Sequence, residues 1–289
     1  MNLDLNFDNL IRHDKNIKED ADNEMIEIHT HILPAIDDGA RTEEEAFGLL
    51  LEYDRQKVTD VVCTSHLPLR QLLELQHDKT YLEDYRQRLK NLQQQAFTNG
   101  IPVLLHPGHE LLLAADLLTC LQKLDHESQR ALCLAESTYM LVEIPPWQTE
   151  GVSFLERILF GIQLLGYMPV LAHPERHISH FGQTFPLLKR WVEQELVCLQ
   201  INAASLVQKK DSGNREHLRM RGCADRLIRE GLVHFAASDA HNLDHRPPRH
   251  DELYQVLKCD YGVVVADSLL QNNPAAVLAD KPVYPALPE

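Results

Sequence analysis

The chain has 289 residues, of which 44% are hydrophobic and 25% charged, and its formal net charge is −15. This composition is ordinary for a soluble globular protein and excludes an intrinsically disordered chain. The negative charge disfavours nucleic acid and anionic membranes as partners, because both are polyanions.

Residues 1–24 have no basic segment followed by an apolar core, so they do not predict a signal peptide. We expect an N-terminal extension outside the fold, either a frayed end or a docking arm for a partner subunit. No apolar run approaches 18 residues, which predicts no transmembrane segment. The six cysteines form no C-x-x-C pair, which indicates free thiols in a reducing cytoplasm.

From Met25 onward, short apolar segments alternate with amphipathic helical patterns. Such segments, rich in β-branched and other apolar residues, are typical of buried parallel strands. The predicted strands are 25–28, 60–64, 101–106, 139–144, 168–173, 197–202 and 233–238. The predicted helices are 43–57, 79–98, 152–165, 184–194 and 215–230. Strand–helix units without a linker between them predict one α/β domain over residues 25–289, with a barrel-like sheet that is closed or nearly so.

Two of these helices carry further information. Thr42-Glu43-Glu44-Glu45 is a capping-box pattern, in which the Thr42 hydroxyl accepts from the Glu45 amide and the Glu45 carboxylate reaches back. Residues 152–165 are apolar almost all round, which predicts a helix that is covered on both sides.

Residues of the types that bind metals follow the predicted strands at their C-terminal ends, where α/β barrels place their active sites. In His29-Thr30-His31, extended backbone points residues i and i+2 to the same side, so both imidazoles can reach one ion. Asp239-Ala240-His241 repeats this spacing after the last strand. The other candidates at such ends are Asp37, Asp38, His66, His109, Glu110, Glu143 and His173. Ionisable groups buried unpaired would cost several kcal/mol each, so the pattern predicts a metal centre.

Cys223 and Arg229 have the C-x5-R spacing of cysteine-dependent phosphatases. That chemistry needs a loop whose amides surround a phosphate. Here the segment lies within the predicted helix 215–230 and has no internal glycine, so we interpret the spacing as coincidental.

Six segments resemble the PHP (polymerase and histidinol phosphatase) superfamily, and the closing NNPAAVLADKP does so too. They are MIEIHTHILPAIDDGARTEEEA, VVCTSH, PGHEL, YMLVEIP, GYMPVLAHPERH and ASDAHNLDHRPP. More narrowly, they are similar to bacterial PHP-type protein-tyrosine phosphatases of capsule and exopolysaccharide regulation. The resemblance spans roughly residues 25–280. It implies a distorted, TIM-like (β/α)7 barrel with three divalent metal ions, typically manganese, with iron, magnesium or zinc as alternatives.

The resemblance also assigns residues. The implied metal ligands are His29, His31, Asp38, His66, Glu110, Glu143, His173, Asp239 and His241. His29 and His31 are expected to share one ion with Asp239, and Glu110 is expected to bridge two ions. The family's two phosphate-contacting arginines correspond to Arg176 and Arg246. Three divalent ions outweigh four carboxylates, so such a centre would be the local positive charge that an acidic protein needs to bind phosphate.

The sequence departs from the family pattern at three places. The leader 1–24 precedes the H-x-H, which in the family lies within the first few residues. Leu67-Pro68-Leu69 follows His66 where the family often has basic residues. His109 stands where the family has a small residue, and it either supports a ligand from behind or lies on the surface.

The resemblance implies a metal-dependent phosphomonoesterase, in which metal-activated hydroxide attacks phosphorus while Arg176 and Arg246 stabilise the phosphoryl charge. The leaving group would be protonated by Asp239, His241 or a metal-bound water. The implied substrate is phosphotyrosine on a protein, foremost a cognate tyrosine autokinase. Two alternatives stay open: a small phosphomonoester such as histidinol phosphate or a nucleotide, and a metal-stabilised regulatory protein without turnover.

Overall fold

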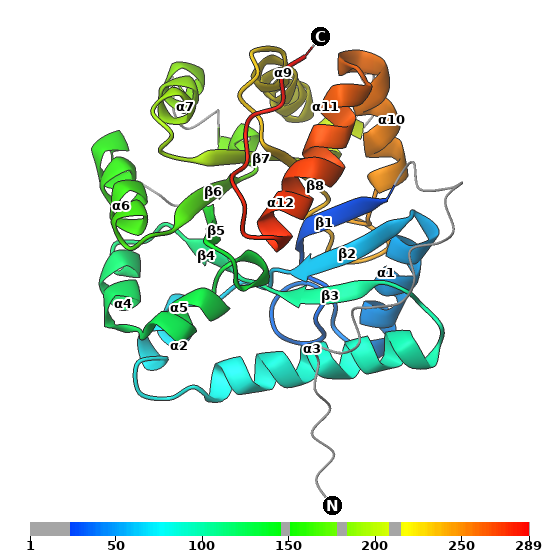
Figure 1. Ribbon diagram of the computed structural model, residues 1–289, viewed down its shortest axis with the longest axis vertical. Coiled ribbons are helices and arrows are strands. Elements are labelled where there is room, and N and C mark those ends of the chain that lie inside the picture. Colours follow the sequence, from blue (N-terminus) through cyan, green and yellow to red (C-terminus); the bar gives the residue numbers. More distant parts are fainter. Residues whose placement is uncertain (1–23, 146–150, 178–183, 208–214, 289) are drawn as a thin grey trace, which may run out of the picture.

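The computed structural model describes residues 24–145, 151–177, 184–207 and 215–288 (Figure 1). The predicted N-terminal extension therefore lies outside the described residues, except for Glu24. All paired strands are parallel and form one sheet of order β1-β2-β3 and another of order β4-β5-β6-β7-β8. The strands are β1 (Met25–Thr30), β2 (Val58–Cys63), β3 (Leu104–Pro107), β4 (Glu110–Leu112), β5 (Tyr139–Glu143), β6 (Met168–Ala172), β7 (Cys198–Asn202) and β8 (Phe235–Ala237).

Most helices lie around the strands, whereas α12 (Asn273–Leu278) lies across the middle of them in this view (Figure 1). The long ones are α1 (Glu43–Arg55), α3 (Thr80–Thr98), α6 (Val152–Leu164), α7 (Thr184–Glu193), α9 (Arg215–Arg229) and α10 (His250–Tyr261). The short ones are α2 (Leu69–Glu74), α4 (Leu117–Lys123), α5 (His126–Ala131), α8 (Ala203–Val207), α11 (Val263–Asp267) and α12 (Asn273–Leu278). Three further turns are η2 (Leu134–Glu136), η3 (Pro174–His177) and the π-helical η4 (Ser268–Asn272). No helix among the described residues is both long and apolar enough to cross a membrane.

Single backbone bridges join the two sheets at their C-terminal ends. Thr30 at the end of β1 pairs with Ala240 beyond β8, and His66 beyond β2 pairs with Glu110 at the start of β4. The amide of Asp239 donates to the carbonyl of His29 at 2.8 Å. The two sheets therefore meet where the predicted ligands lie.

A buried carboxylate reinforces the junction between β1 and β8. Glu27 is fully buried, and its two oxygens accept the amides of His29 at 2.7 Å and Ser238 at 2.9 Å. The Tyr53 hydroxyl lies 3.1 Å from the Ser238 hydroxyl in the same cluster. Because each bonded amide belongs to or adjoins a predicted ligand, Glu27 fixes two ligand-bearing strand ends relative to each other.

The predicted strand 101–106 is the main difference in the sheets. It begins later, as β3, and the chain resumes in the other sheet as β4. Gly108 separates the two, and a Cβ there would lie 2.8 Å from Val62 of β2. The Tyr85 hydroxyl of α3 accepts the Gly108 amide at 3.1 Å, which takes that amide out of any sheet ladder.

Two helix predictions have different outcomes. Thr42 caps α1, because its hydroxyl accepts the Glu45 amide at 3.2 Å, whereas the Glu45 carboxylate accepts the amide of Arg41 instead of Thr42. The prediction that 152–165 is covered on both sides is wrong. Phe160 and Leu164 of α6 are 56% and 72% exposed.

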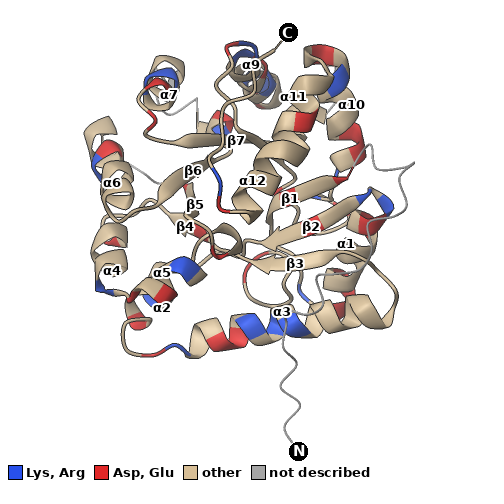
Figure 2. Cartoon of the chain, in the orientation of Figure 1, with Lys and Arg blue, Asp and Glu red and all other residues tan. Residues whose placement is uncertain are grey.

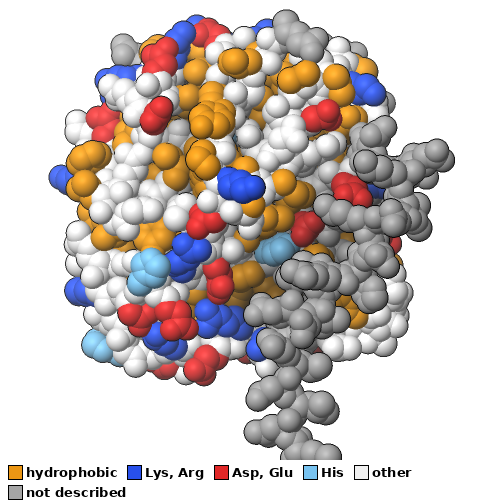
Figure 3. Space-filling model, viewed as in Figure 1, with side chains coloured by type: hydrophobic (Ala, Val, Ile, Leu, Met, Phe, Trp, Pro, Cys, Tyr) orange, Lys and Arg blue, Asp and Glu red, His pale blue; other side chains and the backbone are white. Residues whose placement is uncertain are grey.

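The outer surface carries basic, acidic and hydrophobic side chains next to one another. Lys and Arg are interleaved with Asp and Glu along α3 (Figure 2). On the face shown in Figure 3, hydrophobic side chains are interspersed with charged ones.

We predict that His234 makes stability depend on pH. Its ring is buried and Nδ1 accepts the Leu199 amide at 3.1 Å, and burial lowers the pKa of His234 to about 4. The unfolded chain, with a His pKa of about 6.5, binds this proton more readily, so stability is lost as pH falls from about 6.5 towards 4, by about 3 kcal/mol. In His234→Asn, an amide oxygen can accept the same amide without titrating.

Urea unfolding of both proteins at several pH values measures the effect. The His234→Asn variant should lose less unfolding free energy than the native chain over this interval. Parallel pH profiles would contradict the assignment to His234.

Candidate metal centre

The nine predicted ligands lie together at the C-terminal ends of the strands, around the carboxylate of Glu110. Its Oε2 lies 3.2 Å from His29 Nε2, 3.3 Å from His31 Nε2 and 3.2 Å from His66 Nδ1. Its Oε1 lies 3.3 Å from His173 Nε2. Glu110 thus contacts four histidines, which come from the ends of three strands, β1, β2 and β6.

Asp239 forms a second focus. Its Oδ1 lies 3.5 Å from His29 Nε2, 3.4 Å from His31 Nε2 and 3.6 Å from His241 Nδ1. The two Nε2 atoms of His29 and His31 are themselves 3.4 Å apart. This is the H-x-H geometry expected from i and i+2 positions in extended backbone.

The remaining ligands lie nearer the solvent. Asp38 is 65% exposed, and its Oδ1 lies 3.4 Å from His241 Nε2 and 3.7 Å from His66 Nε2. On the other side, Glu143 Oε1 lies 3.8 Å from His173 Nε2. Groups that could each hold one ion are His31/Asp38/His66/His241, His29/His31/Asp239, His29/Glu110/His173, His66/Glu110/Glu143 and Glu143/His173/His177.

The spacing of these atoms suits shared ions better than hydrogen bonds. Most contacts are 3.2–3.8 Å, longer than the 2.7–2.9 Å typical of charge-assisted hydrogen bonds. Two ligand atoms held about 2.1 Å from one ion in tetrahedral geometry would be about 3.4 Å apart. Oε1 of Glu110 is buried and has no well-aligned hydrogen-bond partner among the described residues. The residues present therefore fit divalent metal ions.

The charges of the cluster shift the pKa values of its members in different directions. Burial would lower the pKa of His29 and of His31, but the carboxylates of Glu110, Asp239 and Asp37 outweigh burial and raise both. Burial, and then the neighbouring Glu110 carboxylate, raise the pKa of Glu143 to about 8. Burial and Arg176 lower the pKa of His173 to about 3, which favours the neutral imidazole that a metal requires. For Asp239, burial alone would raise the pKa, but His29 and Arg176 outweigh it and hold the pKa well below its usual range.

Three further residues support the ligands: Gln200 and Asn202 were not predicted as parts of the site, and Asp37 was predicted as a candidate ligand. Asp37 Oδ2 lies 2.7 Å from His31 Nδ1, and the Gln200 amide oxygen lies 2.9 Å from His29 Nδ1. Both contacts leave the Nε2 lone pair facing the cluster, as ligating histidines require. Asn202 donates to Asp239 Oδ2 at 2.8 Å. The sequence contains a pattern that could have indicated these residues. Gln200 and Asn202 are two positions apart at the end of a predicted strand, and Asp37 directly precedes the predicted ligand Asp38.

Arg176 and Arg246 converge on the edge of the cluster. Their Nη2 atoms lie 2.7 Å and 2.5 Å from Asp239 Oδ2, and both side chains are about one-third exposed. Arg176 lies in η3 directly after β6, and Arg246 in the loop after β8. Two guanidinium groups therefore stand between the buried ligands and solvent.

The surroundings of His109 and Cys223 answer two questions that the sequence raised: whether His109 lies on the surface, and whether Cys223 is a reactive thiol. His109 is not on the surface: it is fully buried, its Nδ1 lies 3.2 Å from the Ala131 carbonyl, and its ring packs 4.3 Å from that of Tyr85. Cys223 lies within helix α9, and burial raises the pKa of its thiol to about 12. A thiol with such a pKa is a poor nucleophile at neutral pH, which agrees with the interpretation of the C-x5-R spacing.

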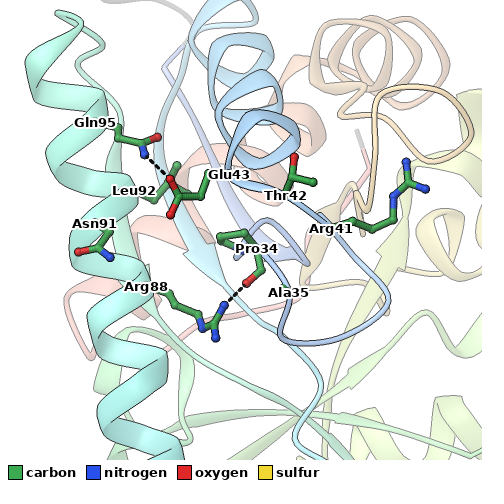
Figure 4. A pocket seen from close by; sticks show the side chains of 9 residues that line it. All are labelled: Pro34, Ala35, Arg41, Thr42, Glu43, Arg88, Asn91, Leu92 and Gln95. Carbon is green, nitrogen blue, oxygen red and sulfur yellow. Dashed lines mark hydrogen bonds between the residues drawn. The ribbon is translucent and has the colours of Figure 1, made fainter.

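The loop that carries Asp37 and Asp38 is held from behind by α3. Arg88 Nη1 donates to the Pro34 carbonyl at 2.8 Å, and Gln95 donates to Glu43 at 3.2 Å (Figure 4). A cavity of about 230 Å³ lies between these two links. The two bonds therefore connect α3 to Pro34 before Asp37 and Asp38 and to the start of α1 after them.

Fold and site together define an α/β protein with a candidate polynuclear metal centre. A sequence profile of the family described as "Capsular polysaccharide synthesis, CpsB/CapC" matches residues 25–279, and the chain belongs to this family. It is similar to the tyrosine-protein phosphatase CpsB of Streptococcus agalactiae serotype III, at 32% identity over 88% of this chain and 98% of CpsB. It is also similar to the tyrosine-protein phosphatase YwqE of Bacillus subtilis, at 28% identity over 86% of this chain and 89% of YwqE.

A solved structure agrees with these sequence matches. It belongs to the crystal structures of YwqE from Bacillus subtilis and CpsB from Streptococcus pneumoniae, described as unique metal-dependent tyrosine phosphatases. The two folds superpose with a TM-score of 0.70 at 26% identity, over 92% of this chain and 99% of the other.

We predict that Gly39→Ala disrupts the centre. A Cβ at Gly39 would lie 2.0 Å from the His31 carbonyl oxygen, so the ligand loop must shift. We expect bound metal to fall by at least one ion per chain and stability to fall by about 1–3 kcal/mol. Elemental analysis and thermal unfolding measure these changes.

Gly222→Ala is the matched control, since a Cβ there meets nothing within 4 Å. It should keep the native metal content. Equal metal content in Gly39→Ala would show that the loop is not needed for binding.

Proposed function

We propose that this chain is a metal-dependent protein-tyrosine phosphatase of capsule or exopolysaccharide control. The observation that carries the proposal is the cluster of five histidines and four carboxylates with two arginines at its edge. The named relatives support it, because CpsB and YwqE are tyrosine-protein phosphatases and the chain is similar to them over most of its length.

The centre is proposed to hold three divalent ions, foremost manganese. The ligands are the nine predicted residues, with His29, His31 and Asp239 sharing one ion and Glu110 bridging two. The contacts of Glu110 with four histidines support the bridging role. Mixed nitrogen and carboxylate ligands are compatible with manganese, iron or zinc, so the donor set alone does not select the metal.

The finer architecture proposed is a distorted (β/α)7 barrel. The two bridges, Thr30 with Ala240 and His66 with Glu110, support it because they link both sheets into a ring. β3 and β4 would then count as one interrupted strand. In this arrangement all ligands open on one face, as in other α/β barrels.

Different side chains of this protein have different roles in phosphate hydrolysis. When bound, divalent ions lower the pKa of water and offset phosphate charge. Arg176 and Arg246 donate planar N–H groups to the phosphoryl oxygens as charge develops on them. Asp239 holds both guanidinium groups in position through Oδ2. Of the two side chains considered for protonating the leaving group, His241 remains the candidate, because His29 and Arg176 outweigh burial and hold the pKa of Asp239 well below its usual range.

A protein substrate is favoured over a small metabolite. The metal cavity has a volume of about 280 Å³, and Asp38 on its edge is 65% exposed. Such an edge leaves room for a polypeptide that carries the phosphate. We propose a cytoplasmic phosphotyrosine protein, foremost a cognate tyrosine autokinase, as the partner.

The first test is turnover of a phosphotyrosine peptide. Manganese-loaded protein should release phosphate, and a chelator should abolish the release, because the hydrolysis requires bound ions. Cys223→Ser should keep full activity, since no thiolate is needed. Full activity of metal-stripped protein would refute the proposal, and faster turnover of histidinol phosphate than of peptide would favour the small-substrate alternative.

The second test concerns the arginines. Arg246→Ala should lower kcat/KM by on the order of 10²-fold, because one charged donor to the phosphoryl group is lost. The bound metal should be unchanged, since Arg246 is not a ligand. Arg249→Ala, which removes a surface pair with Glu252, is the matched control and should be nearly neutral. Equal effects of the two variants would contradict the role of Arg246.

A further inference from the structure

The side chains that line the metal cavity differ in depth. Glu110, His173 and Asp239 are almost fully buried and form its floor. Asp38, His66, Arg176 and Arg246 are about one-third exposed or more and form its rim. A phosphoryl group on the floor would therefore direct its leaving group towards the rim.

Leu112 differs from every other residue of this cavity. Eight of the nine lining residues are charged or are histidines, and Leu112 alone, among the described residues, is hydrophobic. It follows Glu110 by two positions in β4, so both side chains point to the same side of the strand. Leu111 between them is buried in the core. Leu112 is half-buried and pairs in register with Glu143 of β5.

Metal binding gives no reason for a leucine at this position. A hydrophobic side chain among carboxylates and imidazoles cannot coordinate an ion or donate to phosphate. It can contact an apolar part of the substrate, and partial removal of both surfaces from water would stabilise that contact. The guanidinium groups of Arg176 and Arg246 are planar and can stack on an aromatic ring at the same rim.

We propose that Leu112 is the residue that selects aryl over alkyl phosphomonoesters, by packing against the ring next to the scissile phosphate. The proposal rests on the phosphatase function proposed above and explains how this cavity would favour phosphotyrosine over phosphoserine. Leu112 acts on the leaving group, whereas Arg176 and Arg246 act on the phosphoryl group itself.

Direct binding of two non-hydrolysable probes tests the proposal. Phenylphosphonate and methylphosphonate share the charged group and differ in the ring, and calorimetry on manganese-loaded protein measures both affinities. The native chain should bind phenylphosphonate more tightly. Leu112→Ala should weaken phenylphosphonate about fivefold, as expected for losing one apolar contact, and methylphosphonate less than twofold. Leu112→Met should restore the preference, because it keeps a hydrophobic side chain of similar size.

Leu243→Ala is the matched control, since Leu243 is 48% exposed and does not line the cavity. It should leave both affinities and the metal content unchanged, and Leu112→Ala should also keep its metal. With phosphotyrosine and phosphoserine peptides of one sequence, Leu112→Ala should lower the ratio of their kcat/KM values about fivefold.

The outcomes separate this inference from the proposed function. If the native chain hydrolyses phosphotyrosine peptide but Leu112→Ala weakens both probes equally or neither, the inference is wrong and the phosphatase function stands. If metal-loaded native chain binds neither probe and hydrolyses neither peptide, both proposals fail.

Discussion

Burial of like charges at the junction of two sheets is the constraint on which the rest of this structure depends. Glu110 and Asp239 are 1% exposed, and the neighbouring histidines His29, His31 and His173 are buried as well. Carboxylates in such a place are costly unless positive charge is supplied, by protonated imidazoles, arginines or metal ions. The long contacts around Glu110 have the spacing that shared divalent ions would give, and burial together with Glu110 raises the pKa of Glu143 to about 8.

The surrounding framework holds this unfavourable arrangement in place. Glu27 ties the backbone of His29 to that of Ser238, so that β1 and β8 present their ligands together. Asp37 and Gln200 orient His31 and His29 from behind. The stability of the fold and the orientation of the ligands are therefore linked, because the groups that join the two sheets also orient the ligands.

The same geometry explains how an acidic protein can act on phosphate. Lys and Arg alternate with Asp and Glu on the outer helices (Figure 2), whereas the metal cavity has two arginines at its rim beside the ions proposed for the centre. Long-range attraction of a phosphopeptide is weak under these conditions, so recognition depends on short-range contacts. Arg176 and Arg246 would recognise the phosphate, and Leu112 the ring that carries it.

The sequence by itself determined the α/β class and the positions of most strands and long helices, because the periodicity of hydrophobic residues is a local feature. The residues at strand ends gave a list of candidate ligands, and the family resemblance selected the nine that are proposed. The sequence could not show that the predicted strand 101–106 begins only at Leu104, as β3, and that the chain then enters the other sheet as β4. The Gly108 amide between the two strands is bonded to the Tyr85 hydroxyl of α3, a contact that only the folded chain makes. The sequence also missed the exposure of Phe160 and the helices after residue 250, and it left His109 undecided. Only the tertiary structure decided that Gln200 supports His29 and that Leu112 lines the cavity, since these contacts join residues far apart in the chain.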